Sequence, residues 1–192
     1  MNGQSQANIY LALVHYPVKN KNGQTIVSAV TNLDLHDIAR AAKTYGIGAY
    51  YVVTPLEDQK ELVEKIVSHW TQGFGKTYNP KRFEALNLIQ IKDSLQKAIE
   101  EIELKHGMAV KVVATCAADT PQSVGFDKFR QMLVQNNGCY LIVFGTAWGL
   151  TDEFLQNADF VLEPIKGNTE YNHLSVRSAA SIILDRIMGC ER

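Results

Sequence analysis

Short apolar runs alternate with segments of helical periodicity along most of this chain. Runs such as Ile9–Val14 and Tyr140–Phe144 are continuously apolar, which is typical of parallel strands buried on both faces. The alternation predicts an α/β fold, in which a mostly parallel six-stranded sheet carries helices on both faces. The expected strands are Ile9–Val14, Gly48–Thr54, Leu86–Ile91, Val110–Thr115, Tyr140–Phe144 and Phe160–Leu162, and the expected helices are Asp34–Tyr45, Glu57–Trp70, Ser94–His106, Phe126–Asn136 and Ser175–Met188.

Length and composition narrow the class of protein. The chain has 192 residues with no dividing linker, so we expect one domain over residues 1–192. A net charge of −1 argues mildly against non-specific binding of nucleic acid. Three unpatterned cysteines favour a reducing compartment, and residues 1–17 carry no export signal, so we expect a cytoplasmic protein without membrane contact. The five histidines lack ligand spacing, and no metal is expected.

One stretch resembles a phosphate-binding loop without being one. Gly75-Lys76-Thr77 could end a P-loop, but Trp70 stands where the first glycine is needed and a helix precedes the segment. We interpret residues 71–82 as an exposed loop, or alternatively as a loop that contacts the substrate, because its cations alternate with aromatic residues. The substrate-binding candidates in this loop are Lys76, Lys81 and Arg82.

Two other common sites are not supported. Gly46 and Gly48 lack a third glycine and precede a strand, whereas a dinucleotide fingerprint follows one. No G-x-S-x-G elbow of a serine hydrolase occurs.

The segment Thr31–Arg40 combines a helix start with a basic residue. Thr31 or Asn32 can cap the helix, and Asp34 lies near its positive end. Arg40 lies among small and apolar residues, so it either snorkels to solvent or reaches an anionic ligand or a partner subunit.

Two loops in the last third predict a ligand pocket. Gly145 and Gly149 bracket a turn directly after a buried strand, where glycines let the backbone approach a ligand closely. Further on, a polar run leads to Ser175, a suitable N-cap for the last helix. Loops at the carboxyl ends of parallel strands usually carry the ligand site, so we expect both segments to wall one pocket.

These residues together resemble a known family. The strand with the FGTAWGL turn, the LEPI strand and the segment YNHLSVRSAASIIL resemble the carboxyl half of the SPOUT superfamily, S-adenosylmethionine-dependent RNA methyltransferases with a deep trefoil knot. The helix Thr31–Arg40 with the following AAKTYG is similar to the superfamily's first motif. The resemblance covers the whole chain and is strongest to a small bacterial branch. It implies a knot over about residues 110–192, S-adenosylmethionine as cofactor, a homodimer, and tRNA or rRNA as substrate.

The resemblance also implies site residues by position. Arg40 matches the arginine that several ribose-methylating members place near the nucleophile, with Asp34 assisting, and Asn32 joins the substrate-binding candidates. The implied cofactor-binding residues are Thr115, Phe144, Gly145, Thr146, Ala147, Trp148, Gly149, Leu162, Pro164, Ile165, Asn172, His173, Leu174 and Ser175.

Departures from the motifs leave alternatives open. Asp34 stands where ribose-methylating members usually have asparagine, and Ala147 and Trp148 stand in the region of their usual glutamate. Methylation of either a base or a ribose 2′-oxygen is therefore compatible with the chain. Two further hypotheses are a non-catalytic knotted protein that binds the cofactor or RNA, and a flavodoxin-like protein that binds a mononucleotide.

Overall fold

The sheet is larger than the sequence predicts. The computed structural model describes residues 7–190, so the first six residues of the stretch without an export signal lie outside it. Seven strands form one sheet in the order β5-β4-β1-β8-β6-β9-β7, and every pair of neighbours is parallel. The strands are β1 (Asn8–Val14), β4 (Tyr50–Val53), β5 (Ile89–Lys92), β6 (Val110–Thr115), β7 (Ser123–Val124), β8 (Cys139–Gly145) and β9 (Phe160–Leu162).

The six expected strands are confirmed, but the expected count of six is wrong. β7 at the sheet edge has two half-buried residues and pairs only with β9. Such a short strand carries no apolar run or period that a sequence pattern could register. The third expected strand also begins later, at Ile89, because Leu86 ends a helix.

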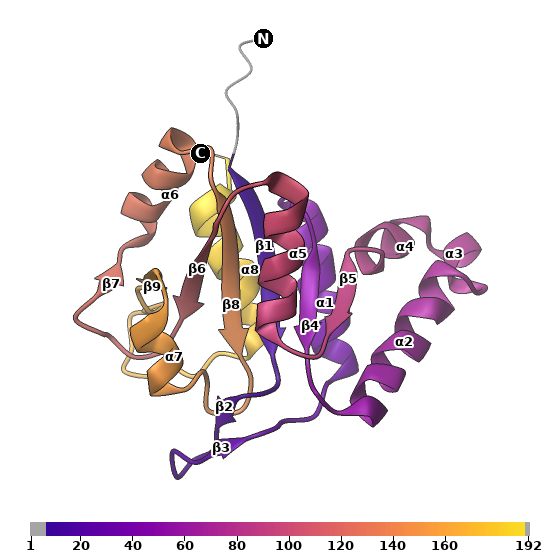
Figure 1. Cartoon of the computed structure of the whole chain (residues 1–192), viewed down its shortest axis with the longest axis horizontal. Helices are drawn as coiled ribbons and strands as arrows, with labels where there is room; N and C mark the ends of the chain where they lie inside the picture. The colour runs from indigo at the N-terminus through magenta and orange to yellow at the C-terminus, as the bar shows by residue number, and fades with distance from the viewer. Residues whose placement is uncertain (1–6, 191–192) are drawn as a thin grey trace.

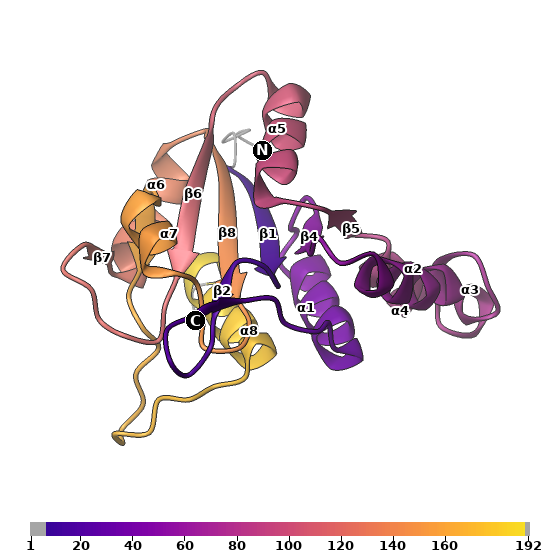
Figure 2. The ribbon, with the colours of Figure 1, turned by 60° about the horizontal axis from the view of Figure 1, so that its bottom comes forward.

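Helices cover both faces of the sheet, as expected (Figures 1 and 2). One face is covered mainly by α1, α6 and α8, and the other by α5 and α7. The short helices α3 and α4 lie with α2 beyond the edge strand β5. The helices are α1 (Asn32–Thr44), α2 (Glu57–Thr71), α3 (Gly75–Tyr78), α4 (Pro80–Leu86), α5 (Leu95–His106), α6 (Phe126–Gln135), α7 (Asp152–Asn157) and α8 (Val176–Met188).

The expectation of an exposed loop over residues 71–82 is wrong about the loop, because most of this segment is helical, while most of its residues are exposed as expected. Pro80 occupies the first turn of α4, and the Asn79 side chain accepts a 3.0 Å hydrogen bond from the Arg82 backbone N–H. Proline and an amide cap at these positions start a helix. Gly75 serves packing, because a Cβ there would lie 2.6 Å from the Trp70 ring.

The order of the strands places β8, from the last third of the chain, beside the first strand, β1. β8 is inserted between β1 and β6, and its first six residues are buried. A small hairpin follows β1, formed by β2 (Val18–Lys19) and β3 (Thr25–Ile26). α8 then packs on α1 and α6. Loops that are about 130 residues apart in sequence therefore meet at one edge of the sheet.

Candidate functional site

A cavity of about 650 Å³ opens at the carboxyl ends of β1, β6, β8 and β9. Its walls are the loops after these strands and the segment that leads into α8. Parallel α/β sheets bind ligands at this edge, and the volume lies in the usual range for small-molecule sites. The predicted cofactor residues that line it are Thr115, Phe144, Gly145, Thr146, Ala147, Trp148, Gly149, Ile165, Asn172, His173, Leu174 and Ser175.

Two predicted cofactor residues lie behind the wall. Leu162 ends β9 and is fully buried in the core. Pro164 is buried between Glu163 and Ile165, which do line the cavity. The resemblance assigns both through their backbone, so their contact with a cofactor stays a prediction.

The turn after β8 is a tight loop with little room for side chains. A Cβ on Gly145 would lie 2.5 Å from the Leu150 backbone nitrogen, and Gly149 has φ +95°. Lys19 of the hairpin brackets the loop: its N–H donates to the Gly149 carbonyl at 2.9 Å, and its carbonyl accepts from the Trp148 N–H at 3.1 Å. The loop therefore presents backbone groups to the cavity in a fixed arrangement.

A chain of hydroxyl groups connects this loop to a buried histidine. Ser28 Oγ lies 2.5 Å from Thr146 Oγ1 and 3.1 Å from His15 Nδ1, and Thr146 Oγ1 donates to the Val14 carbonyl at 3.0 Å. Ser28 and Thr146 line the cavity, and His15 lies fully buried behind them. Burial lowers the pKa of His15 to about 4, although the Asp34 carboxylate acts in the opposite direction. The histidine is therefore neutral at pH 7.

Asp34 and a basic residue that the sequence analysis missed form the polar corner of the cavity. The Asp34 carboxylate accepts from Thr31 Oγ1 at 2.7 Å and lies 3.4 Å from Arg177 Nη1. Arg177 also lies 3.6 Å from Asp37. A cation in the first turn of a helix opposes the helix dipole, and Arg177 in α8 is such a residue. The unfavourable position of Arg177 is the feature of the sequence that could have marked it as a site residue.

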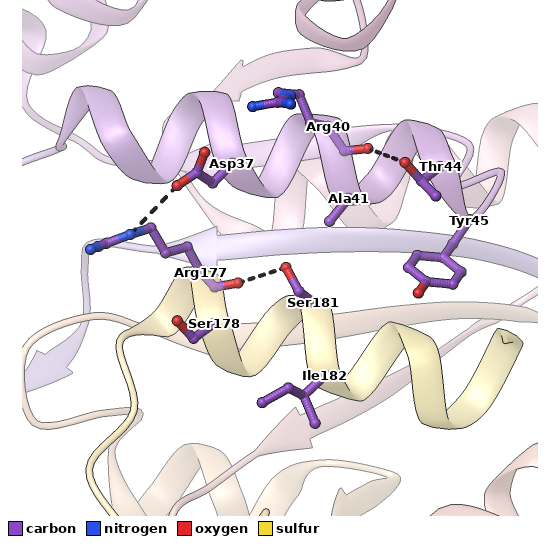
Figure 3. A pocket seen from close by; sticks show the side chains of 9 residues that line it. All are labelled: Asp37, Arg40, Ala41, Thr44, Tyr45, Arg177, Ser178, Ser181 and Ile182. Carbon is purple, nitrogen blue, oxygen red and sulfur yellow. Dashed lines mark hydrogen bonds and ion pairs between the residues drawn. The ribbon is translucent and has the colours of Figure 1, made fainter.

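Arg40 does not reach the cavity. Asp34 lines it, whereas Arg40 is exposed further along α1 and lies in the groove between α1 and α8 and in a second groove towards α2. Figure 3 shows the Arg40 side chain directed away from α8, while Asp37 faces Arg177. Of the two predicted catalytic residues, only Asp34 is therefore at the cavity wall.

The predicted substrate-binding residues lie outside the cavity. Asn32 and Arg82 line the second groove with Arg40. Lys76 Nζ lies 4.9 Å from the centroid of the Phe83 ring, and Lys81 pairs with Glu84 at 3.5 Å. The structure therefore brings Asn32, Arg40 and Arg82 together and leaves the two lysines on the surface of α3 and α4.

Residues 7–190 meet the requirements of neither a metal site nor a membrane-spanning helix. No group of three or more histidine, cysteine, aspartate or glutamate side chains is arranged to hold a metal ion. Within the same residues, no helix has both the length and the hydrophobicity needed to cross a bilayer.

The fold and the cavity define an α/β protein with a ligand site at the carboxyl edge of a parallel sheet. The chain belongs to the family of SAM-dependent RNA methyltransferases, whose model matches residues 8–189. This membership confirms the resemblance to methyltransferases and disfavours a flavodoxin-like mononucleotide protein.

The curated relatives that the chain resembles include a named methyltransferase. The chain is 44% identical over 182 residues to a tRNA (guanine-N(1)-)-methyltransferase of Oleidesulfovibrio alaskensis, a match that covers 95% of the chain but only 42% of the relative. It is 38% identical to an uncharacterized protein of Aquifex aeolicus, with 96% of the chain and 90% of the relative covered. The chain thus spans less than half of the first relative.

The structural neighbours show the same fold. TrmJ from Z. mobilis superposes with a TM-score of 0.60 at 15% identity, over 96% of this chain and 69% of that chain. The TrmH/SpoU tRNA modifying enzyme of A. aeolicus gives 0.53 at 15% identity, over 96% and 75%. At such low identity these likenesses concern the fold alone.

The Gly145 loop generates the first prediction. Gly145→Ala places a methyl group against the Leu150 backbone, so the loop must open. We expect the free energy of unfolding to fall by about 1–3 kcal/mol, as for overpacked sites, and calorimetry to show at least tenfold weaker binding of S-adenosylhomocysteine. Gly167→Ala is the control, because no atom lies within 4 Å of its added Cβ. Equal affinities in both variants would contradict the fixed-loop interpretation.

The buried His15 generates a second prediction. Its pKa is about 4 in the folded protein, against an ordinary histidine value of 6.5, so the unfolded chain binds the proton more readily between these values. Stability should therefore be full above pH 6.5 and fall as the pH drops towards 4, by up to about 3 kcal/mol from this residue. Urea unfolding between pH 8 and pH 4.5 measures this loss. His15→Gln should flatten the dependence, and an unchanged slope would exclude His15 as its source.

Proposed function

We propose that this protein transfers the methyl group of S-adenosylmethionine to RNA, with tRNA or rRNA as the substrate class. The observation that carries the proposal is the backbone-lined cavity at the strand ends, with Asp34 and Arg177 at its rim, in a chain of this family. The name of the O. alaskensis relative supports tRNA. More than half of that relative lies outside the match, so the named guanine-N1 reaction can reside there, and either a base or a ribose remains a suitable acceptor.

The residues of the cavity fit S-adenosylmethionine. The loop Gly145–Leu150 offers backbone donors and acceptors for a nucleoside, and the exposed Trp148 ring offers an aromatic surface. The carboxylates of Asp34 and Glu163 lie in the wall, where they can face a positively charged ligand. Asn172 closes the opposite side, because its side chain donates to the Ala117 carbonyl at 2.7 Å.

When bound, S-adenosylmethionine supplies a methyl group already activated by its sulfonium. The chain then has two tasks, which are to orient the RNA nucleophile and to accept its proton. We assign the proton to the Asp34 carboxylate, which is buried beside the cavity and held by Thr31 and Arg177. We assign to Arg177, which lies 3.4 Å from Asp34, the role near the nucleophile that the family resemblance implies for Arg40.

The groove between α1 and α8 supports the proposed homodimer. It measures about 580 Å³, and its lining combines small residues such as Ala41, Ser178 and Ser181 with the charged Asp37, Arg40 and Arg177 (Figure 3). Small residues on two adjacent helices allow the close approach of a second copy across a two-fold axis. We also propose that the chain forms one methyltransferase domain with a trefoil knot over about residues 110–192. We further propose that it works in the cytoplasm, which its three free cysteines support.

A test of the dimer uses the groove itself. We expect sedimentation of the unaltered protein to show a dimer at micromolar concentration, and Ala41→Lys to shift it to monomer because the added chain fills the groove. Val134→Lys is the matched control, since Val134 is an exposed residue of α6 away from the groove. A monomeric unaltered protein would argue against the dimer.

A methyl-transfer assay tests the function. Radiolabelled S-adenosylmethionine and RNA from cells that lack this protein should give labelled RNA with the unaltered protein. Asp34→Asn should lower the rate by about 10²–10⁴, the usual contribution of general base catalysis, while binding of S-adenosylhomocysteine persists. Binding of that ligand without transfer to any RNA would instead favour the non-catalytic hypothesis.

A further inference from the structure

A second groove, separate from the cavity, lies between α1, α2 and α4. It has a volume of about 460 Å³ and is lined chiefly by Leu33, His36, Arg40, His69, Trp70 and Arg82. Leu33 is 59% exposed, although it is a large apolar residue. No step of the proposed methyl transfer uses this groove, yet it shares α1 with the cavity.

Aromatic contacts hold one of its arginines in place. The Arg82 guanidinium lies 4.5 Å from the centroid of the Trp70 ring. The His36 and His69 rings contact Trp70 edge-on, with centroid distances of 5.6 Å and 5.1 Å. A guanidinium stacked in this way keeps its donors free and loses little conformational entropy when it binds an anion.

The groove carries positive charge that the protein does not neutralise. Among residues 7–190, neither Arg40 nor Arg82 forms an ion pair with a carboxylate. Three carboxylates on the same helices pair with other cations: Asp37 with Arg177 at 3.6 Å, Glu61 with Lys65 at 3.3 Å and Glu84 with Lys81 at 3.5 Å.

The charges of the two arginines act on the pKa of His36, which also lines the groove. Burial lowers the pKa of His36, the nearby Arg82 lowers it further, Asp37 opposes the shift and Arg40 adds to it. The charged and titratable groups around the groove are Asp37 and Arg40 from α1, Lys65 and His69 from α2, and Arg82 from α4. An anion placed between the arginines therefore meets an excess of cations.

We propose that this groove binds a phosphodiester group of the RNA strand, held by Arg40 and Arg82, beside the nucleotide that enters the cavity. The proposal rests on the proposed function, because it names where the same substrate is held. Guanidinium groups match phosphate oxygens in bidentate geometry. One turn of α1 separates Asp34 at the cavity from Asp37 at the groove, so a single strand that crosses α1 can contact both.

Phosphate binding has a consequence for pH. The anion favours protonated His36, so the pKa of this histidine rises in the complex and binding takes up a proton. Affinity for RNA should therefore increase as the pH falls through the pKa that His36 has in the complex. His36→Gln should remove this increase while keeping most of the affinity at pH 8.

Fluorescence anisotropy with labelled, unmodified tRNA transcripts tests the proposal at fixed ionic strength and pH 8. Arg82→Gln and Arg40→Gln should each weaken binding by about 5- to 10-fold, and each should reduce the slope of log affinity against log salt by about one. The control is Lys105→Gln on α5, whose ammonium lies 5.5 Å from the Tyr10 ring centroid, outside the groove. It should change neither quantity.

Calorimetry with S-adenosylhomocysteine separates this proposal from the proposed function. All three variants should bind that ligand like the unaltered protein. If Arg82→Gln binds tRNA as tightly as Lys105→Gln does, or if all cation variants lose affinity equally, the groove proposal is overturned even where methyl transfer is intact. If the unaltered protein does not bind S-adenosylhomocysteine, the proposed function is overturned instead. The tRNA-binding results test the groove proposal alone.

Discussion

The insertion of β8 between β1 and β6 is the constraint on which the site depends. This buried strand delivers the glycine-bracketed loop to the end of β1, where the hairpin residue Lys19 brackets it through two backbone hydrogen bonds. The same placement brings Thr146 within hydrogen-bond distance of Ser28 and the Val14 carbonyl. Apolar burial of the sheet thereby fixes the backbone that faces the ligand, and the chain can use small residues there because the sheet holds the loop.

Helix α1 contributes residues to the cavity and to both grooves. Its first turn places Asp34 at the cavity, the next turn places Asp37 beside Arg177, and Arg40 follows on the outer side. The sequence of Thr31–Arg40 suggests that Asp34 and Arg40 act at one site, but the structure places them at different sites. In the function that we propose, the Asp34 carboxylate beside Arg177 lies at the methyl-transfer site. Arg40, which forms no ion pair among residues 7–190, lies where we propose that an RNA phosphate binds. In a chain of net charge −1, the proposed phosphate contact would rest on local positive charge and would position the RNA strand.

The sequence was most informative where burial imposes a pattern. Continuous apolar runs located six strands, and the two glycines around residues 145–149 predicted a loop that the structure shows to be sterically closed. Sequence patterns did not predict the features whose position depends on a few single contacts. β7 is two residues long, and α4 starts at Pro80 because Asn79 caps it. Arg177 lies beside Asp34 through the packing of α8 on α1, which no spacing in one sequence could reveal.

We propose that the cavity between residues 144–150 and 172–175 holds the adenosyl cofactor. A crystal structure of the protein grown with S-adenosylhomocysteine would show whether it does. We predict the nucleoside against the backbone of the loop after β8 and the thioether sulfur turned towards Asp34. Density for the ligand elsewhere, or an empty cavity at saturating ligand, would exclude this cavity as the cofactor site.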